Sequence, residues 1–254
     1  FIFLSQDFGK QELLKIKNFL VKAGIKAETY EAFNQKIRED FVKGDIQVIL
    51  GFSNIRNPLT RGIDIPEGVR YAIFIGIPKY KILLEPTLAP KSLFILGLLF
   101  REELKYKFPN LSSLLGFLKR ISFLKEEDIE KNPKLKEKLQ PFKEELDKVL
   151  KNGIQDKSLF SRYIIELKDN KPYLVISDPK GYLQASGRTS RLYPKGLSCG
   201  LSVVISDNPR LLEDLKLRLS NLGYEIEFKN FEEVDIDSIK HQIDLDLSLI
   251  HISE

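Results

Sequence analysis

Short apolar runs alternate with amphipathic stretches over the first 77 residues, and this alternation constrains the fold more than any other feature of the sequence. The apolar runs have the length of strands and occupy residues 1–5, 27–30, 47–51 and 71–77. Apolar side chains at helical spacing fill residues 9–23 and 31–42. Strands that alternate with helices at this spacing predict a parallel sheet with right-handed crossovers.

The same pattern returns in the last third of the chain. Residues 163–167 and 173–177 flank a polar turn and predict a hairpin that returns the chain to the sheet. The elements expected next are a buried strand at 201–205, an amphipathic helix at 208–222 and a further strand at 224–228. The predicted fold class is therefore α/β, with a parallel sheet and helices on both faces.

Residues 81–159 interrupt this pattern and predict a mostly helical insert. Apolar helical segments at 92–106 and 111–124 precede a charged helical stretch at 125–150. Residues 81–160 carry 16 basic and 12 acidic side chains, and their net charge of +4 equals that of the whole chain. This surplus favours contact with nucleic acid or an acidic partner. The alternative is a solvated insert that its lysines keep soluble.

Composition excludes several kinds of site. The single cysteine, Cys199, rules out an internal disulfide framework and a cysteine metal site. His241 and His251 are the only histidines, so no metal site and no Ser-His-Asp triad is expected. No signal peptide and no run of about 18 apolar residues is visible, so no membrane partner is expected. The lack of methionine suggests a fragment of a longer polypeptide, and high Lys, Glu and Ile contents suit a thermophile.

The stretch at residues 184–191 carries the most suggestive polar pattern. Gln184, Arg188 and Arg191 stand at offsets of zero, four and seven, which on one α-helix would place them on one stripe. Two fixed cations and an amide suit a phosphate-bearing ligand. Ser-Asp-Pro at 177–179 predicts the start of that helix, and Gly187 inside it would let another surface approach closely. The alternative is a solvated basic helix beside a turn.

The loop at residues 57–66 leaves the carboxyl end of the third strand, where ligands bind in open α/β sheets. Gly62, between Arg61 and Asp64, would let the backbone approach a ligand. The Asp64 carboxylate could accept a hydrogen bond from a ribose hydroxyl. An ordinary turn punctuated by Gly and Pro is the alternative.

Three short patterns resemble the motifs of superfamily-2 helicases. Residues 184–191 read Gln-x-x-Gly-Arg-x-x-Arg and resemble motif VI, and residues 60–64 read Thr-Arg-Gly-x-Asp and resemble motif V. Residues 1–5 resemble the strand that carries motif IV. Their order and their separation from the strands match the second RecA-like domain, so the resemblance implies a RecA-like version of the α/β fold.

Within that superfamily the chain closely resembles reverse gyrases, over roughly residues 1–79 and 160–230. The resemblance is carried by residues 61–66, 71–78, 182–192 and 196–204. The middle of the chain matches only in position, because reverse gyrases carry there a variable insert, the latch, that contacts DNA and the topoisomerase half. Thr60 departs from the usual alanine of motif V, and residues 52–57 depart from the usual small and aromatic residues.

The resemblance implies three parts. Residues 1–80 and 160–232 would form a discontinuous second RecA-like domain, and residues 81–159 a latch-like helical insert. Residues 233–254 would form a tail leading toward a topoisomerase domain missing from this chain. From about Val234 the tail alternates Asp with Ile and Leu, which suggests a helix.

A reverse gyrase couples ATP hydrolysis in a two-domain helicase-like module to a type IA topoisomerase and introduces positive supercoils into DNA. The resemblance implies that Arg188 and Arg191 reach the γ-phosphate of ATP, where one acts as an arginine finger. Gln184 would help to orient this row of arginines, and Asp64 would lie near the ribose or help to couple the domains. The implied nucleotide contacts also include Gly62 and Gly187.

The implied nucleic-acid contacts are Thr60, Arg61 and Ser53. The sequence contains no phosphate loop and no evident DExD-type box, so ATP and its Mg²⁺ would be held mainly by a first RecA-like domain. The expected partners are DNA and the first RecA-like and type IA topoisomerase domains of the same polypeptide, in the cytoplasm. The isolated chain is expected to hydrolyse ATP negligibly.

Two other functions fit the same motifs. One is a fragment of another superfamily-2 DNA or RNA helicase, and the other is a catalytically inert nucleic-acid-binding module with a helicase-like fold. The long insert between motifs V and VI and the Thr-Ser-Arg-Leu sequence at 189–192 favour a reverse gyrase over both.

Overall fold

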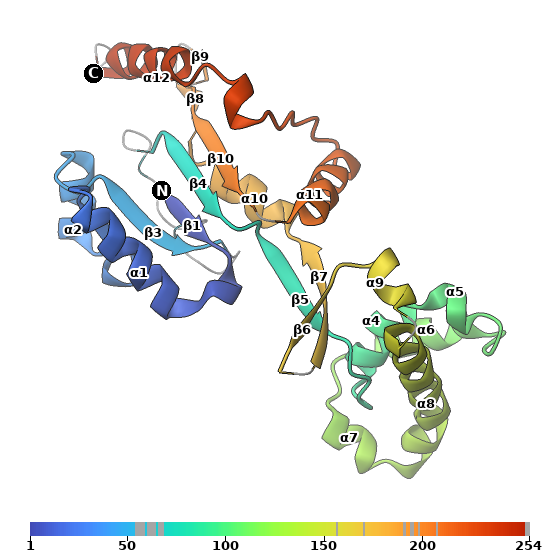
Figure 1. The fold of residues 1–254 in the computed structure, drawn as a ribbon. Helices are drawn as coiled ribbons and strands as arrows, with labels where there is room; N and C mark the ends of the chain where they lie inside the picture. The colour runs from blue at the N-terminus through green and yellow to red at the C-terminus, as the bar shows by residue number, and fades with distance from the viewer. Residues whose placement is uncertain are drawn as a thin grey trace. The chain divides into compact units, whose positions relative to one another are not determined.

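The computed structural model describes residues 1–53, 59, 65, 69–155, 157–169, 171–189, 192–193, 196–197, 199–206 and 208–251. The chain divides into two compact units (Figure 1). The sheet unit comprises Phe1–Tyr80 and Ile176–Glu254, and the insert unit comprises Lys81–Val175. The sequence pattern places the end of the insert at residue 159, whereas contacts in the structure keep the chain with the insert unit up to Val175.

A five-stranded parallel sheet forms the centre of the sheet unit. Its strands are β1 (Ile2–Leu4), β2 (Ala27–Thr29), β3 (Val48–Phe52), β4 (Tyr71–Ile75) and β10 (Leu201–Ile205). Their order is β10-β4-β1-β3-β2, and each neighbouring pair is parallel. The predicted α/β class with a RecA-like parallel sheet is therefore confirmed.

Helices and short turns of helix surround this sheet. They are η1 (Gln6–Phe8), α1 (Gly9–Lys22), η2 (Tyr30–Ala32), α2 (Gln35–Val42), α10 (Pro179–Ser186), α11 (Pro209–Asn221), η3 (Phe231–Glu233) and α12 (Ile236–His251). A small antiparallel pair, β8 (Leu192–Tyr193) and β9 (Gly196–Leu197), precedes β10. The helix suggested by the tail sequence is present as α12.

The two faces of the sheet bury alternate residues of each strand, as strand geometry requires. Ile2 of β1 belongs to an apolar cluster with Leu13 of α1. Phe3, the next residue, faces the other way and stacks on Phe74 of β4 with ring centroids 5.3 Å apart. Phe74 also lies against Tyr182 of α10 at 5.1 Å. Helices α1 and α10 therefore cover opposite faces of the sheet.

Two local predictions in this unit are wrong. Residues 224–228 form no strand, and the Phe228 ring instead lies 5.7 Å from Tyr182, so this segment packs on α10 through its side chains. The helix predicted at 31–42 is divided into η2 and α2. Asn34 separates them, because its side chain caps α2 by accepting from the Ile37 N–H at 3.0 Å.

The insert unit is mostly helical, as predicted. Its elements are β5 (Lys79–Leu83), α4 (Pro90–Leu99), α5 (Arg101–Leu104), α6 (Leu111–Arg120), α7 (Glu126–Glu130), α8 (Pro133–Gln155), α9 (Ser158–Arg162), β6 (Ile165–Lys168) and β7 (Lys171–Ser177). Strands β5 and β7 carry the chain from one unit to the other. In the described part of the chain, no helix is long and apolar enough to span a bilayer.

The predicted hairpin forms, but it does not join the parallel sheet as predicted. Strands β6 and β7 pair antiparallel. They join β5 in a separate three-stranded sheet with the order β5-β7-β6 and do not extend the parallel sheet. The sequence pattern did not predict β5.

Candidate functional site

The helix that leads to Arg188 begins where the sequence predicts. Asp178 is 3% exposed and caps α10, because its carboxylate accepts from the Gly181 N–H at 2.9 Å. Pro179 follows at the first helical position, where no N–H is needed. The Asp178 N–H donates to the Pro78 carbonyl at 2.7 Å. The start of α10 is thereby tied to the segment beyond the carboxyl end of β4.

A carboxylate on α11 fixes the residue before this cap. Asp214 accepts from the Ser177 N–H at 2.9 Å, from the Ser177 hydroxyl at 2.7 Å and from Arg218 Nε at 2.9 Å. Burial raises the pKa of Asp214, but these hydrogen bonds outweigh that effect, so the pKa lies below its ordinary value. An ionised Asp214 therefore links α11 to the entry of α10.

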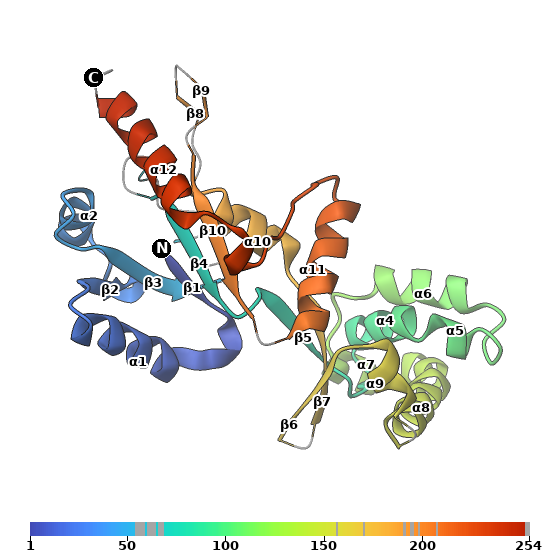
Figure 2. The same cartoon turned by 45° about the horizontal axis from the view of Figure 1, so that its top comes forward.

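Helix α10 runs antiparallel to the strands that it covers (Figure 2). It starts near Pro78, and its Tyr182 lies over Phe74 in the middle of β4. The Ser202 hydroxyl, near the start of β10, donates to the Tyr182 hydroxyl at 3.4 Å. Ala185 is fully buried near the end of the helix. The turn that follows α10 therefore lies toward the amino-terminal edge of β10.

The helix ends earlier than predicted, and Arg188 lies in the turn that follows it. Helix α10 stops at Ser186, and Gly187 is its exposed C-cap. The Thr189 N–H and hydroxyl both donate to the Ser186 carbonyl, at 3.0 and 2.9 Å. The predicted single helical stripe through residues 184–191 is therefore wrong, because a tight turn replaces the last part of the helix.

Gln184 and Arg188 are the two polar side chains of the predicted phosphate-binding pattern that the structure describes. Both are half-buried. The Gln184 Oε1 atom is buried and has no hydrogen-bond partner among the described residues. A buried acceptor left unpaired costs about 1–3 kcal/mol, so this oxygen is suited to a donor such as a ribose hydroxyl or a guanidinium. An open acceptor and a cation four residues apart fit a nucleotide ligand.

Most of the other predicted site residues lie outside the described residues; these are Arg191, Thr60, Arg61, Gly62 and Asp64. Leu59 and Ile65, which flank the motif V pattern, are buried. Ser53 is 4% exposed at the carboxyl end of β3, and its hydroxyl donates to the Leu4 carbonyl at 3.0 Å. The hydroxyl hydrogen of Ser53 is therefore used in a bond within the sheet. A contact between Ser53 and DNA stays a prediction.

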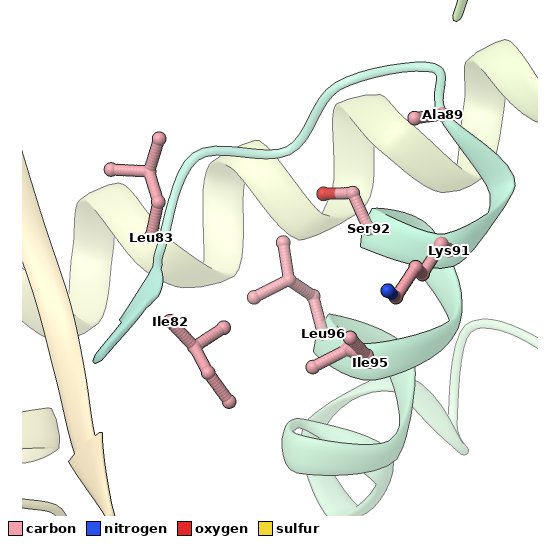
Figure 3. A pocket seen from close by; sticks show the side chains of 7 residues that line it. All are labelled: Ile82, Leu83, Ala89, Lys91, Ser92, Ile95 and Leu96. Atoms are coloured by element: carbon pink, nitrogen blue, oxygen red, sulfur yellow. The ribbon is translucent and has the colours of Figure 1, made fainter. Parts of the chain in front are cut away.

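An apolar pocket lies in the insert unit (Figure 3). It has a volume of about 310 Å³ and is lined by Ile82, Leu83, Ala89, Lys91, Ser92, Ile95 and Leu96. Lys91 and Ser92 are its only polar lining residues, so it does not suit a nucleotide phosphate. Within the described ranges, no group of three or more His, Cys, Asp or Glu side chains could hold a metal ion.

The sequence pattern missed two residues that support the site. Asp214 lies on an amphipathic helix, where an acid is expected on the solvent face, and its bond to Ser177 joins segments far apart in sequence. Thr189 carries a local sequence signal for the turn. A hydroxyl three residues after a helical carbonyl can bond back to it, and this bond competes with the continuation of the helix.

Comparison with known proteins gives one consistent result. The chain is 37% identical over 253 residues to reverse gyrase 1 of Aquifex aeolicus (strain VF5), covering 96% of this chain and 22% of that protein. Reverse gyrase 2 of the same organism is 36% identical over 252 residues, with the same coverages of 96% and 22%. The reverse gyrase of Methanocaldococcus jannaschii is 32% identical over 251 residues, covering 99% of this chain and 13% of that protein. No protein-family model matches.

The chain thus spans about a fifth or less of the length of these relatives. These similarities confirm the resemblance to reverse gyrases that the motifs indicate. Because the aligned region covers 96% of the chain or more, it includes the insert, which the motifs matched only in position.

Proposed function

We propose that this chain is a segment of a reverse gyrase, in which it forms the second RecA-like domain with a latch-type insert. The observation that carries this proposal is the similarity of nearly the whole chain to a short segment of several reverse gyrases. The parallel sheet and the motif VI pattern beside it support the same assignment. The rest of the polypeptide then supplies the first RecA-like domain and the type IA topoisomerase domain.

In this proposal the chain provides one side of a nucleotide site. ATP, when bound, supplies the phosphoanhydride bond whose cleavage drives the enzyme. Arg188 and Arg191 neutralise charge at the γ-phosphate, and one of them is the arginine finger. Gln184 orients the arginines or a ribose hydroxyl with its open acceptor. The remaining proposed contacts are Gly187, Gly62 and Asp64, while the phosphate loop and Mg²⁺ belong to the first RecA-like domain.

Positive supercoiling tests this function most directly. The full-length polypeptide that carries the chain should convert negatively supercoiled plasmid into positively supercoiled topoisomers when ATP is present. Without ATP, it should only relax the plasmid. Two-dimensional gel electrophoresis separates these products. Relaxation without positive supercoils in the presence of ATP would count against the proposal.

DNA is the proposed partner of both units, through Thr60, Arg61 and Ser53 and through the insert. In the insert, Lys119, Arg120 and Lys125 are exposed and lie in the sequence within four residues of Phe123, whose side chain is 78% exposed. Cations interleaved with an exposed aromatic ring suit the backbone and bases of DNA.

Removing these three cations should lower the salt dependence of DNA binding. We expect the Lys119→Ala, Arg120→Ala, Lys125→Ala variant to reduce the slope of log K against log salt by about 1 to 3. Fluorescence anisotropy at several salt concentrations measures it. The matched control replaces three lysines that pair with carboxylates at 2.5, 2.8 and 3.4 Å, namely Lys105, Lys143 and Lys148. Equal slopes in both variants would argue against this DNA surface.

A further inference from the structure

We propose that Gly200 is a positioning residue for Arg188. In this inference the backbone before β10 packs directly on the backbone of Thr189, and that contact sets the place of the turn that carries the arginine. The inference rests on the proposed function of Arg188. It concerns a residue that the motif VI pattern does not include.

The contact leaves no room for a side chain at residue 200. A Cβ atom built on Gly200 would lie 2.5 Å from the carbonyl carbon and from the Cβ of Thr189, and closer still to the Thr189 carbonyl oxygen. Two of these three atoms belong to the backbone, so they cannot rotate away as the end of a flexible side chain can. Gly200 is therefore required for space.

Thr189 cannot move independently of Arg188. It is 3% exposed, and its N–H and hydroxyl both bond to the Ser186 carbonyl. The Arg188 N–H donates to the Ala185 carbonyl at 3.2 Å. Because a planar peptide joins residues 188 and 189, a displacement of the Thr189 backbone is passed on to the arginine.

Gly200, in contrast, is next to a fixed strand. The Leu201 N–H donates to the Arg70 carbonyl at 2.9 Å. From Leu201 onward, β10 pairs with β4 over five consecutive residues. An added methyl group would therefore displace the turn more readily than the strand, and ordinary contact distances require a shift of roughly 1 Å.

A shift of this size matters for an arginine that acts on a transition state. A misplacement of about 1 Å in a positioned catalytic group costs on the order of 10²-fold in rate. The binding of ATP in its ground state is affected much less, because the phosphate cradle lies on another domain in the proposed function. The consequence is a loss in kcat with little change in KM.

The test uses the full-length polypeptide with the substitution Gly200→Ala. We expect kcat for DNA-stimulated ATP hydrolysis to fall on the order of 10²-fold, with KM for ATP within about threefold. Affinity for ADP with aluminium fluoride, which mimics the transition state, should fall while affinity for ADP is unchanged. Combining Gly200→Ala with Arg188→Ala should give no further loss beyond Arg188→Ala alone.

Two controls separate positioning from general destabilisation. Leu215→Ala removes a fully buried side chain from α11 and should lower the melting temperature without the selective loss of aluminium fluoride affinity. Gly116 lies on an exposed turn of α6, where an added Cβ would have nothing within 4 Å. The Gly116→Ala variant should therefore behave as the unmodified protein.

The outcomes distinguish this inference from the proposed function. If Arg188→Ala lowers kcat but Gly200→Ala does not, the positioning role is wrong and the arginine finger stands. If Arg188→Ala leaves kcat unchanged, the role proposed for Arg188 itself is wrong, and Arg191 is left as the arginine finger. Should Gly200→Ala not fold, Thr189→Val removes the hydrogen bond from the hydroxyl to the Ser186 carbonyl at nearly constant shape and leaves the bond from the N–H in place. It should lower kcat severalfold at constant KM, and an unchanged kcat in that variant would overturn the inference.

Discussion

Replacing Arg188 by alanine in the full-length polypeptide should lower kcat for DNA-stimulated ATP hydrolysis by about 10³- to 10⁵-fold. The proposed guanidinium stabilises charge that develops on the transferring phosphoryl group, and a neutral methyl group leaves that charge uncompensated. Because the arginine acts in the transition state, KM for ATP should change little. A coupled assay of ADP release measures both constants. Arg191→Ala is expected to impair hydrolysis as well.

The control for this experiment is Arg38→Ala. Arg38 lies on α2 in the same sheet unit and is half-buried like Arg188, but it belongs to none of the predicted motifs. The Arg38→Ala variant should keep a kcat near that of the unmodified protein. Arg188→Lys should restore only a small part of the activity, because lysine lacks the planar fork of donors. Equal activity of the Arg188→Ala and Arg38→Ala variants would exclude an arginine finger at residue 188.

The parallel sheet could be predicted because its signal is local and repeated. Each strand of the first half is a short apolar run, and each connection has the period of a helix. The alternation continues within a strand, where Ile2 packs on one face and Phe3 on the other. A one-residue shift in register would move each set to the opposite face, against a helix that it does not fit, so the pattern specifies the fold strongly.

The end of α10 was predicted wrongly because the offsets between polar residues do not show where a helix ends. Residues 184, 188 and 191 suit one stripe only if the helix continues past Ser186. In the structure, the hydroxyl and N–H of Thr189 both donate to the Ser186 carbonyl and close a turn there. The site is therefore a helix followed by a tight turn, and Arg188 is placed by the turn.

The sheet that the β6–β7 hairpin joins could not be predicted, for a different reason. Local pattern identifies a hairpin, but not the strand whose edge it joins. Strand β5 reads Lys-Tyr-Lys-Ile-Leu at 79–83, a short and partly charged run that carries little strand signal. Its pairing with β7 is a contact between segments far apart in sequence. The bond of Asp214 to Ser177 was missed for the same reason.

Replacing Phe142 by alanine should have the largest effect on stability. Phe142 of α8 is fully buried, and its ring lies 5.1 Å from Phe108 in an edge-to-face arrangement. It also packs on the bare backbone of Gly97 in α4, where an added Cβ would lie 2.8 Å from its ring. Losing a buried phenylalanine costs about 3–5 kcal/mol, a large part of the stability of a domain of this size.

We expect the melting transition of the insert unit to fall by on the order of 15 °C in the Phe142→Ala variant. Circular dichroism follows it well, because α8 is a 23-residue helix. Phe123→Ala is the matched control, since its ring is 78% exposed in the same unit and its loss should change stability by no more than about 0.5 kcal/mol. A similar melting temperature for the two variants would contradict the packing described for Phe142.

The same variant tests whether the two units fold separately. Phe3 and Phe74 are fully buried within the sheet unit, so this unit has a core of its own. In the full-length polypeptide that carries Phe142→Ala, ATP hydrolysis without DNA should therefore persist above the lowered melting temperature of the insert, while DNA affinity and its salt dependence should fall. Simultaneous loss of hydrolysis and of insert structure would instead mean that the two cores unfold as one.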